Sequence, residues 1–250
     1  MRSTTTRVRI PATSVLTCAQ FAAQVEQSSR QFGSQDRRKR EQMLLDTFEG
    51  KVAEVAIAEL ASDFGFRLGL DFALYAEGQT DNGSDISTIS RDGVTRLVTK
   101  KLDVKGIGSR SSWLLVEDHK FQADVYLLVR HRLSRDELSR MLITERVVSD
   151  LEVEVLGFAT ARDFFAPDGE PYVRLARGER LRAIPEIWDG QAPDTPGWIS
   201  CFRSQWDSYP QIGPRLDAPS NVGIPASWLR TNFEDLFTFC WDHAIPEDNA

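Results

Sequence analysis

The chain has 250 residues, of which 41% are hydrophobic, a content that is ordinary for a globular protein and sufficient for a sizeable core. Its three cysteines lie far apart and show no CxxC spacing, so a disulfide framework or a zinc site is not expected and a reducing, cytoplasmic compartment fits. The formal net charge of -7 argues mildly against a nucleic-acid binder, although binding depends on local patches rather than on totals.

No contact with a membrane is expected. The first six residues contain no apolar stretch of the kind found in signal peptides. No apolar run approaches the roughly 18 residues needed to cross a bilayer.

A long helix is predicted over residues 34–62, with Ser34 as its N-cap. Its second half is apolar nearly all round and nevertheless contains Glu54 and Glu59. A charge in such surroundings is costly unless it is paired or bound to a metal ion. The apolar positions recur at three- and four-residue spacing: Leu44, Phe48, Val52, Val55, Ala56 and Leu60.

The next segments predict a β-hairpin over residues 85–98, turning at residues 91–93, and a strand that carries Asp103 and Lys105. Successive side chains of a strand alternate between its faces, so Asp103 and Lys105 point the same way. Asp85 opens the neighbouring strand. Two carboxylates and an ammonium group are therefore expected at one sheet edge, and these groups are the ones that metal-assisted attack on a phosphodiester uses.

The remaining pattern predicts further strands and helices and a change of texture near residue 167. Residues 125–129 are almost wholly apolar, which favours a strand buried on both faces. Prolines and tryptophans cluster in the last third of the chain. We therefore expect a core over residues 1–165 and a loop-rich accessory extension over residues 166–250. The other predicted elements are strands at 70–76, 113–116 and 153–158 and helices beginning at 134 and 231.

The order of a helix Glu, a strand-opening Asp and an Asp-x-Lys strand resembles the PD-(D/E)XK nuclease superfamily, the fold of many restriction endonucleases. The resemblance covers roughly residues 40–165, and no proline precedes Asp85, in contrast to the family pattern. It implies an α/β fold: a restriction-endonuclease-like core with a mixed central sheet flanked by helices. The matching segments are residues 50–54, 83–85 and 102–106, followed by 123–126 and 157–160.

The resemblance also implies a function, namely Mg²⁺-dependent hydrolysis of double-stranded DNA by a type II-like restriction endonuclease. By carry-over from the family, Asp85 and Asp103 bind the metal and Glu54 supports it or its water. Lys105 orients the attacking water and balances developing charge. Since cleavage of both strands commonly uses two sites, a homodimer is expected.

Several assignments stay open at the level of sequence. Asp85 could be a plain turn residue, with Asp81 as the ligand instead. Glu49 and Glu59 compete with Glu54 for the supporting role. Asp103 and Lys105 could form an ordinary ion pair on an exposed strand, worth only about 0–1 kcal/mol.

Two other functions remain alternatives. One is a catalytically silent nucleic-acid-binding or assembly subunit on the same fold, because fold does not fix function. The other is a nuclease of DNA repair or of phage DNA processing. Residues 174–182 and the tryptophan-rich tail are the candidates for contacts with DNA or with a second subunit, and no element that would read bases can be identified.

Overall fold

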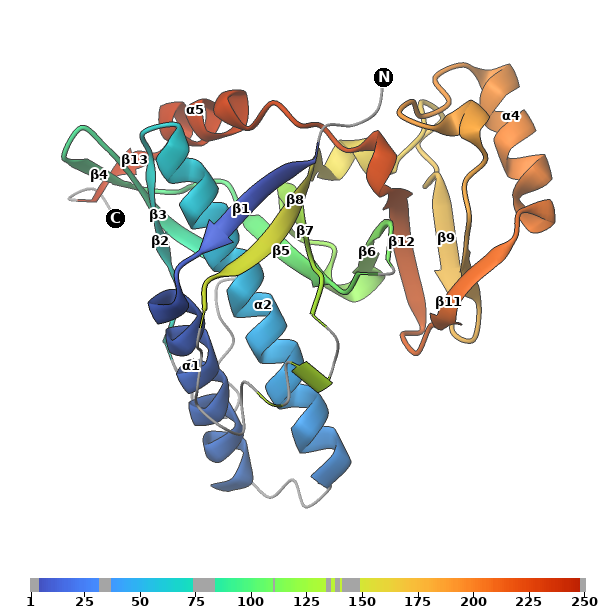
Figure 1. Ribbon diagram of the computed structural model, residues 1–250. Helices are drawn as coiled ribbons and strands as arrows, with labels where there is room; N and C mark the ends of the chain where they lie inside the picture. The colour runs from blue at the N-terminus through green and yellow to red at the C-terminus, as the bar shows by residue number, and fades with distance from the viewer. Residues whose placement is uncertain are drawn as a thin grey trace.

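The computed structural model describes residues 5–31, 37–73, 84–109, 111–133, 136–137, 140 and 149–247. Figure 1 shows one lobe built around α1, α2 and a central sheet, and a second lobe that contains β6, β9, β11, β12 and α4. The chain is an α/β protein with a mixed sheet and several helices, as the sequence predicts. In the described part of the chain, no helix is long and apolar enough to cross a membrane.

The central sheet has the strand order β1-β8-β7-β5. Only β5 and β7 run parallel, and the other neighbours are antiparallel, so the sheet is mixed. The predicted apolar strand is confirmed as β7, which is buried on both faces. The bounds are β1 Thr6–Ile10, β5 Leu102–Ile107, β7 Val125–His131 and β8 Leu151–Thr160.

Of the two long helices, α2 (Arg37–Asp63) lies against this sheet, and α1 (Ala12–Gln31) packs alongside α2. The long predicted helix is confirmed as α2, while its proposed cap Ser34 lies outside the described residues. The sequence predicts a helix over residues 19–31, which is confirmed as the later part of α1, but it did not predict β1 or the first turns of α1, because both depend on packing against distant segments. At the opposite end, α5 (Phe233–His243) buries Phe233, Leu236 and Phe237 in the same core.

A second sheet has the order β13-β4-β3-β2 and contains the predicted hairpin. Its two-residue turn is Asp92–Gly93, with φ values of 51° and 80°, the left-handed pair that such turns require. The strand expected at 70–76 is corrected to β2, which ends at Leu70; residues 74–83 lie outside the described residues. The bounds are β2 Arg67–Leu70, β3 Ile86–Arg91, β4 Val94–Leu97 and β13 Ile245–Pro246.

The last third of the chain, predicted to be a loop-rich accessory extension, contains short strands, 3-10 helices and α-helices as well as loops. It contains most of a folded lobe with its own hydrophobic core, in which β6, β12 and β9 form a sheet and β10 pairs with β11. The strand β6 precedes residue 165 and α5 belongs to the first core, so a boundary at 165 does not separate the two cores. The bounds are β6 Trp113–Glu117, β9 Val173–Ala176, β10 Arg180–Arg182, α4 Pro196–Gln205, β11 Gln211–Arg215 and β12 Ser220–Pro225.

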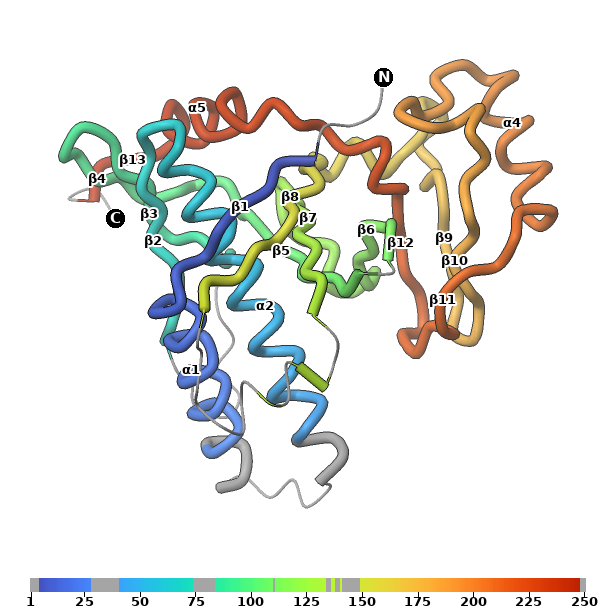
Figure 2. The backbone as a smooth tube through the Cα atoms, viewed as in Figure 1, coloured from blue at the N-terminus to red at the C-terminus, as the bar shows by residue number. Residues whose placement is uncertain are grey.

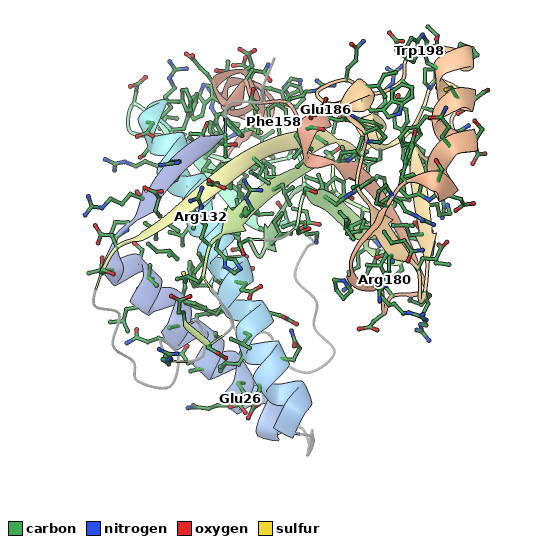
Figure 3. The ribbon with its side chains drawn as sticks, turned by 45° about the vertical axis from the view of Figure 1, so that its right-hand side comes forward. Glu26, Arg132, Phe158, Arg180, Glu186 and Trp198 are labelled. Carbon is green, nitrogen blue, oxygen red and sulfur yellow. The ribbon has the colours of Figure 1, made fainter. Side chains whose placement is uncertain are left out.

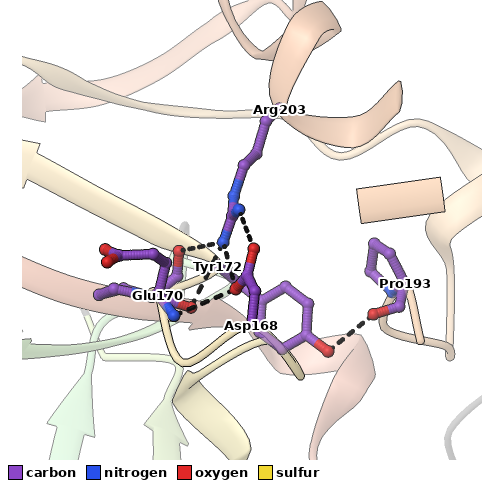
Figure 4. A network of polar contacts seen from close by, with 6 residues as sticks. Asp168, Glu170, Tyr172, Pro193 and Arg203 are labelled. Carbon is purple, nitrogen blue, oxygen red and sulfur yellow. Dashed lines mark hydrogen bonds and ion pairs between the residues drawn. The ribbon is translucent and has the colours of Figure 1, made fainter. Parts of the chain in front are cut away.

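Polar contacts fix α4 to the rest of the second lobe (Figure 4). The guanidinium of Arg203 donates to both carboxylate oxygens of Asp168, at 2.6 and 3.2 Å, and to the carbonyls of Glu170 and Pro171. The hydroxyl of Tyr172 donates to the carbonyl of Pro193 over 2.7 Å. These bonds join α4, the turn at residues 168–171 and the loop that contains Pro193 into one folded unit.

Short 3-10 helices connect several of these elements, and the predicted strand at 113–116 is confirmed as β6. The helix predicted from residue 134 falls mostly outside the described residues. The 3-10 helices are η1 Asp118–Lys120, η2 Ala161–Phe164, η3 Glu186–Trp188, η4 Trp206–Ser208 and η5 Ala226–Trp228.

Replacing Gly106 by Ala is expected to lower the free energy of unfolding by about 1–3 kcal/mol, because the added methyl group would overpack the core at that point. A Cβ at this position would lie 2.9 Å from the carbonyl oxygen of Glu49, so α2 and β5 would have to separate. The measurement is urea denaturation. Gly108→Ala is the matched control, because a Cβ there meets nothing within 4 Å; equal losses for the two variants would contradict the close packing of α2 on β5.

Candidate functional site

The four side chains singled out by sequence come from three separate elements, which are α2, the start of β3 and β5. The helix α2 supplies Glu54, the residue before β3 is Asp85, and β5 supplies Asp103 and Lys105. Asp85 interacts electrostatically with Glu54, Asp103 and Lys105. The path of the backbone through these elements can be followed in Figure 2.

Asp85 is held in place by the backbone of β5. Its amide N–H donates to the carbonyl of Leu102 over 2.9 Å, and its carboxylate oxygen Oδ2 accepts from the amide of Val104 over 2.6 Å. The hydroxyl of the preceding residue, Ser84, accepts from the amide of Leu102 and donates to the carbonyl of Ile86. Asp85 is therefore more than a free turn residue, because its side chain joins two strands.

Asp103 and Lys105 share one face of β5, as the strand period predicts. Their neighbours in β7 are Tyr126 and Leu128, which belong to the core of the second lobe. The intervening residues of β5 face the core beneath α2. Lys105 Nζ lies 2.7 Å from Asp103 Oδ2, and both side chains remain partly exposed. The pair is thus accessible from the side on which the second lobe lies.

A residue with no predicted role, Lys51, lies one helical turn before Glu54. Its Nζ is 2.7 Å from Glu54 Oε2 and donates to the carbonyl of Asp71 over 2.5 Å. The same ammonium group lies 5.2 Å from the ring centres of Phe21 and Phe72. The i,i+3 spacing of Lys51 and Glu54 was the available signal, because residues three apart are neighbours on a helix.

Glu54 is a carboxyl group in strongly unfavourable surroundings for a negative charge. Its side chain is only 7% exposed. Burial, and after it the negative charge of Asp85, raises the pKa of Glu54 to about 8, against the opposing effect of Lys51. An ionised Glu54 therefore needs more positive charge than Lys51 alone supplies.

The carboxyl group of Asp85 also has a raised pKa, by a smaller amount than Glu54. Burial raises the pKa of Asp85 to about 6, and the negative charge of Asp103 contributes in the same direction. The hydrogen bond from the amide of Val104 and the positive charges of Lys105 and Lys51 lower it. Two interacting carboxyl groups with raised pKa values mark a place with a shortage of positive charge, and such perturbation is typical of functional sites.

The structure also places the competing acids. Glu49 lies nearer the start of α2 and faces His131, with 3.6 Å between Oε2 and Nε2. Glu59 is half-buried further along α2, and its carbonyl oxygen accepts from Ser62. Of the three glutamates, Glu54 is the one that interacts with Asp85. Asp81 lies outside the described residues.

The donor set suits a hard divalent cation such as Mg²⁺, which prefers oxygen ligands and keeps several of its waters. In the described part of the chain, no three His, Cys, Asp or Glu side chains are arranged to enclose a metal ion as they stand. Mg²⁺ does not require such a cage, since it commonly binds through one or two carboxylates together with a substrate phosphate. The raised pKa values of Glu54 and Asp85 indicate that an added cation would be favourable here.

Comparisons with models of protein families, with curated proteins and with solved structures found no match.

Between about pH 5 and pH 8, the stability of the metal-free protein is expected to fall as the pH rises. The Glu54 carboxyl ionises near pH 4.5 in the unfolded chain but only near pH 8 in the folded protein. The folded state therefore binds more protons in this range, and linkage makes a rise in pH unfavourable to it. In the Glu54→Gln variant, the free energy of unfolding should fall over this pH range by on the order of 1–3 kcal/mol less than in the parent.

The measurement is urea denaturation at several pH values in the presence of EDTA. The control is Glu59→Gln, the same change on the same helix, which should keep the slope of the parent. A Glu54→Gln variant with an unchanged slope would show that Glu54 is not the buried acid described here.

Proposed function

We propose that this protein is a Mg²⁺-dependent endonuclease that hydrolyses phosphodiester bonds of double-stranded DNA, as a type II-like restriction endonuclease does. The observation that carries the proposal is that Asp85 interacts both with Glu54 of α2 and with the Asp103–Lys105 pair of β5, although these residues come from distant parts of the chain. Three carboxyl groups beside an ammonium group form the combination that metal-assisted phosphodiester hydrolysis requires.

In this proposal Asp85 and Asp103 hold the metal, with Glu54 in support. Asp85 uses Oδ2 to accept the amide of Val104, Asp103 uses Oδ2 to meet Lys105, and Glu54 uses Oε2 to meet Lys51. Within the described residues, no hydrogen bond or ion pair engages the second oxygen of any of these three carboxylates, which leaves those oxygens available as metal ligands. The chemistry that Mg²⁺ supplies when bound is polarisation of the phosphate and a lower pKa for the attacking water.

The protein groups have separable roles. The amide of Val104 fixes the carboxylate of Asp85, so this ligand needs little reorganisation when it is used. Lys105 has a partly exposed ammonium group, held by Asp103, at the place where negative charge would develop on the phosphate. Lys51 holds Glu54 through the 2.7 Å contact and opposes the rise in its pKa, which makes Lys51 a positioning residue.

A homodimer is part of the proposal, because cutting both strands in one encounter commonly uses two sites. Sedimentation at working concentration should show two chains per particle. A monomer that makes double-strand breaks in a single encounter would contradict this part and leave the chemistry of the site untouched.

One observation favours a second candidate, a catalytically silent nucleic-acid-binding or assembly subunit. Lys51 and Lys105 already neutralise part of the charge of Glu54 and Asp103 without any metal. A site in which lysines replace the metal would have the same outline and no activity. The two candidates differ in one property, which is the uptake of Mg²⁺ by carboxylates.

Asp103→Ala and Lys105→Ala are each expected to lower the rate of plasmid cleavage in Mg²⁺ by about 10²–10³-fold or more, because each removes a group that acts on developing charge. The measurement is conversion of supercoiled plasmid to nicked and linear forms. Lys120→Ala is the matched control, because Lys120 forms an exposed ion pair with Glu117 outside the site.

Cleavage by both variants at the rate of the parent would show the assignment to be wrong. Calorimetry with Mg²⁺ then separates the two candidates. An enzyme should bind Mg²⁺ in a manner that Asp103→Ala abolishes, whereas a silent module should show no carboxylate-dependent uptake.

A further inference from the structure

The ribbon formed by β10 and β11 presents two arginines directly opposite one another. Arg180 in β10 and Arg215 in β11 are paired across the antiparallel strands, and both are exposed. The register shifts just after Arg180, and Gly213, with φ of 68°, lies in the part of β11 that takes up the shift. Like charges directly opposite in a sheet are destabilising, so an outside anion would relieve this arrangement.

Three other arginines of the second lobe are already engaged with acids. Arg174 pairs with Asp118, and Arg182 lies 3.2 Å from Asp207. The third is Arg203, which is clamped by Asp168. By contrast, no ion pair of Arg180 or Arg215 is found within the described ranges. These two guanidinium groups are therefore available to a partner.

The acid next to Arg180 in the chain is hydrogen-bonded elsewhere and forms no ion pair with it within the described residues. The carboxylate of Glu179, next to Arg180 in the chain, accepts the amide of Ala176 over 2.5 Å. Arg177 adds a third exposed guanidinium group, whose Nε donates to the carbonyl of Asp217 over 2.8 Å. The name "arginine ribbon" is used below for Arg177, Arg180 and Arg215.

The arginine ribbon belongs to the lobe that lies on the same side of the central sheet as Asp103 and Lys105. Both residues have neighbours in β7 whose side chains form part of the core of this lobe. In Figure 1, β9, β11 and the lower halves of α1 and α2 extend in the same direction from that sheet. Figure 3 shows Arg180 at the far end of the second lobe, away from Trp198.

We infer that the arginine ribbon binds the sugar–phosphate backbone of duplex DNA while the scissile bond lies at Asp85, Asp103 and Lys105, an inference that rests on the proposed function. Guanidinium groups bind phosphate oxygens through two parallel hydrogen bonds. The chain carries a net charge of -7 and as a whole repels DNA, so binding must come from local groups of free cations such as this one. The contact is to the backbone and positions the duplex without reading its sequence.

The test measures binding of a fluorescent duplex by anisotropy, in EDTA so that no cleavage occurs, at several KCl concentrations. The double variant Arg180→Gln, Arg215→Gln should bind the duplex roughly tenfold more weakly. The negative slope of log K against log salt should become less steep by about 1.8, since each lost phosphate contact removes about 0.9. Arg180→Lys, Arg215→Lys keeps both charges and should keep most of the slope, which excludes misfolding as the cause.

The matched control is Arg7→Gln, Arg9→Gln, which removes two exposed arginines from β1, in the first lobe. Equal losses for the control, or parental affinity and slope for the ribbon variant, would overturn the inference. A parent that binds no duplex would also overturn it.

The outcome is separable from that of the proposed function. A parent that binds duplex through the ribbon and does not cut it in Mg²⁺ refutes the nuclease and supports the ribbon. A parent that cuts, with a ribbon variant that binds and cuts equally well, supports the nuclease and refutes the ribbon.

Discussion

The hydrogen bond from the amide of Val104 to the carboxylate of Asp85 is the contact on which the site depends. It joins the start of β3 to the middle of β5 and places Asp85 beside Glu54 of α2. Because a backbone amide is the donor, the carboxylate is fixed by the fold itself rather than by a mobile side chain. Any displacement of β5 relative to β3 would disperse the cluster.

Placing three acids around this contact has a cost that the fold offsets only in part. Lys51 and Lys105 each neutralise one carboxylate, yet the pKa values of Glu54 and Asp85 remain raised. A purely structural site would gain by replacing these acids with apolar residues, because an incompletely compensated buried charge is unfavourable. A bound divalent cation would supply the positive charge that is still missing here, and this shortage is the physical basis of the proposed activity.

The residues of the site come from two sides of the central sheet, and each side faces a different hydrophobic core. Strand β7 is buried on both faces and separates the core beneath α2 from the core of the second lobe. Since β5 is its parallel neighbour, alternate side chains of β5 are divided in the same way. Glu54 and Lys51 approach from the helical side, whereas Asp103 and Lys105 face the side of the second lobe. A substrate on that side would meet the arginine ribbon as well.

Features that depend on neighbouring residues could be predicted from the chain alone: the shared face of Asp103 and Lys105, the tight turn at Asp92–Gly93 and the fully apolar strand β7. It did not determine the partners of these features, because pairing between distant segments leaves no local pattern. Only the tertiary structure placed β1 against β8, brought Lys51 to Glu54 and Asp71, and built a second core from β6 and the last third of the chain. The choice of Glu54 over Glu49 and Glu59 was likewise tertiary, because all three lie on one helix and only the position of Asp85 distinguishes them.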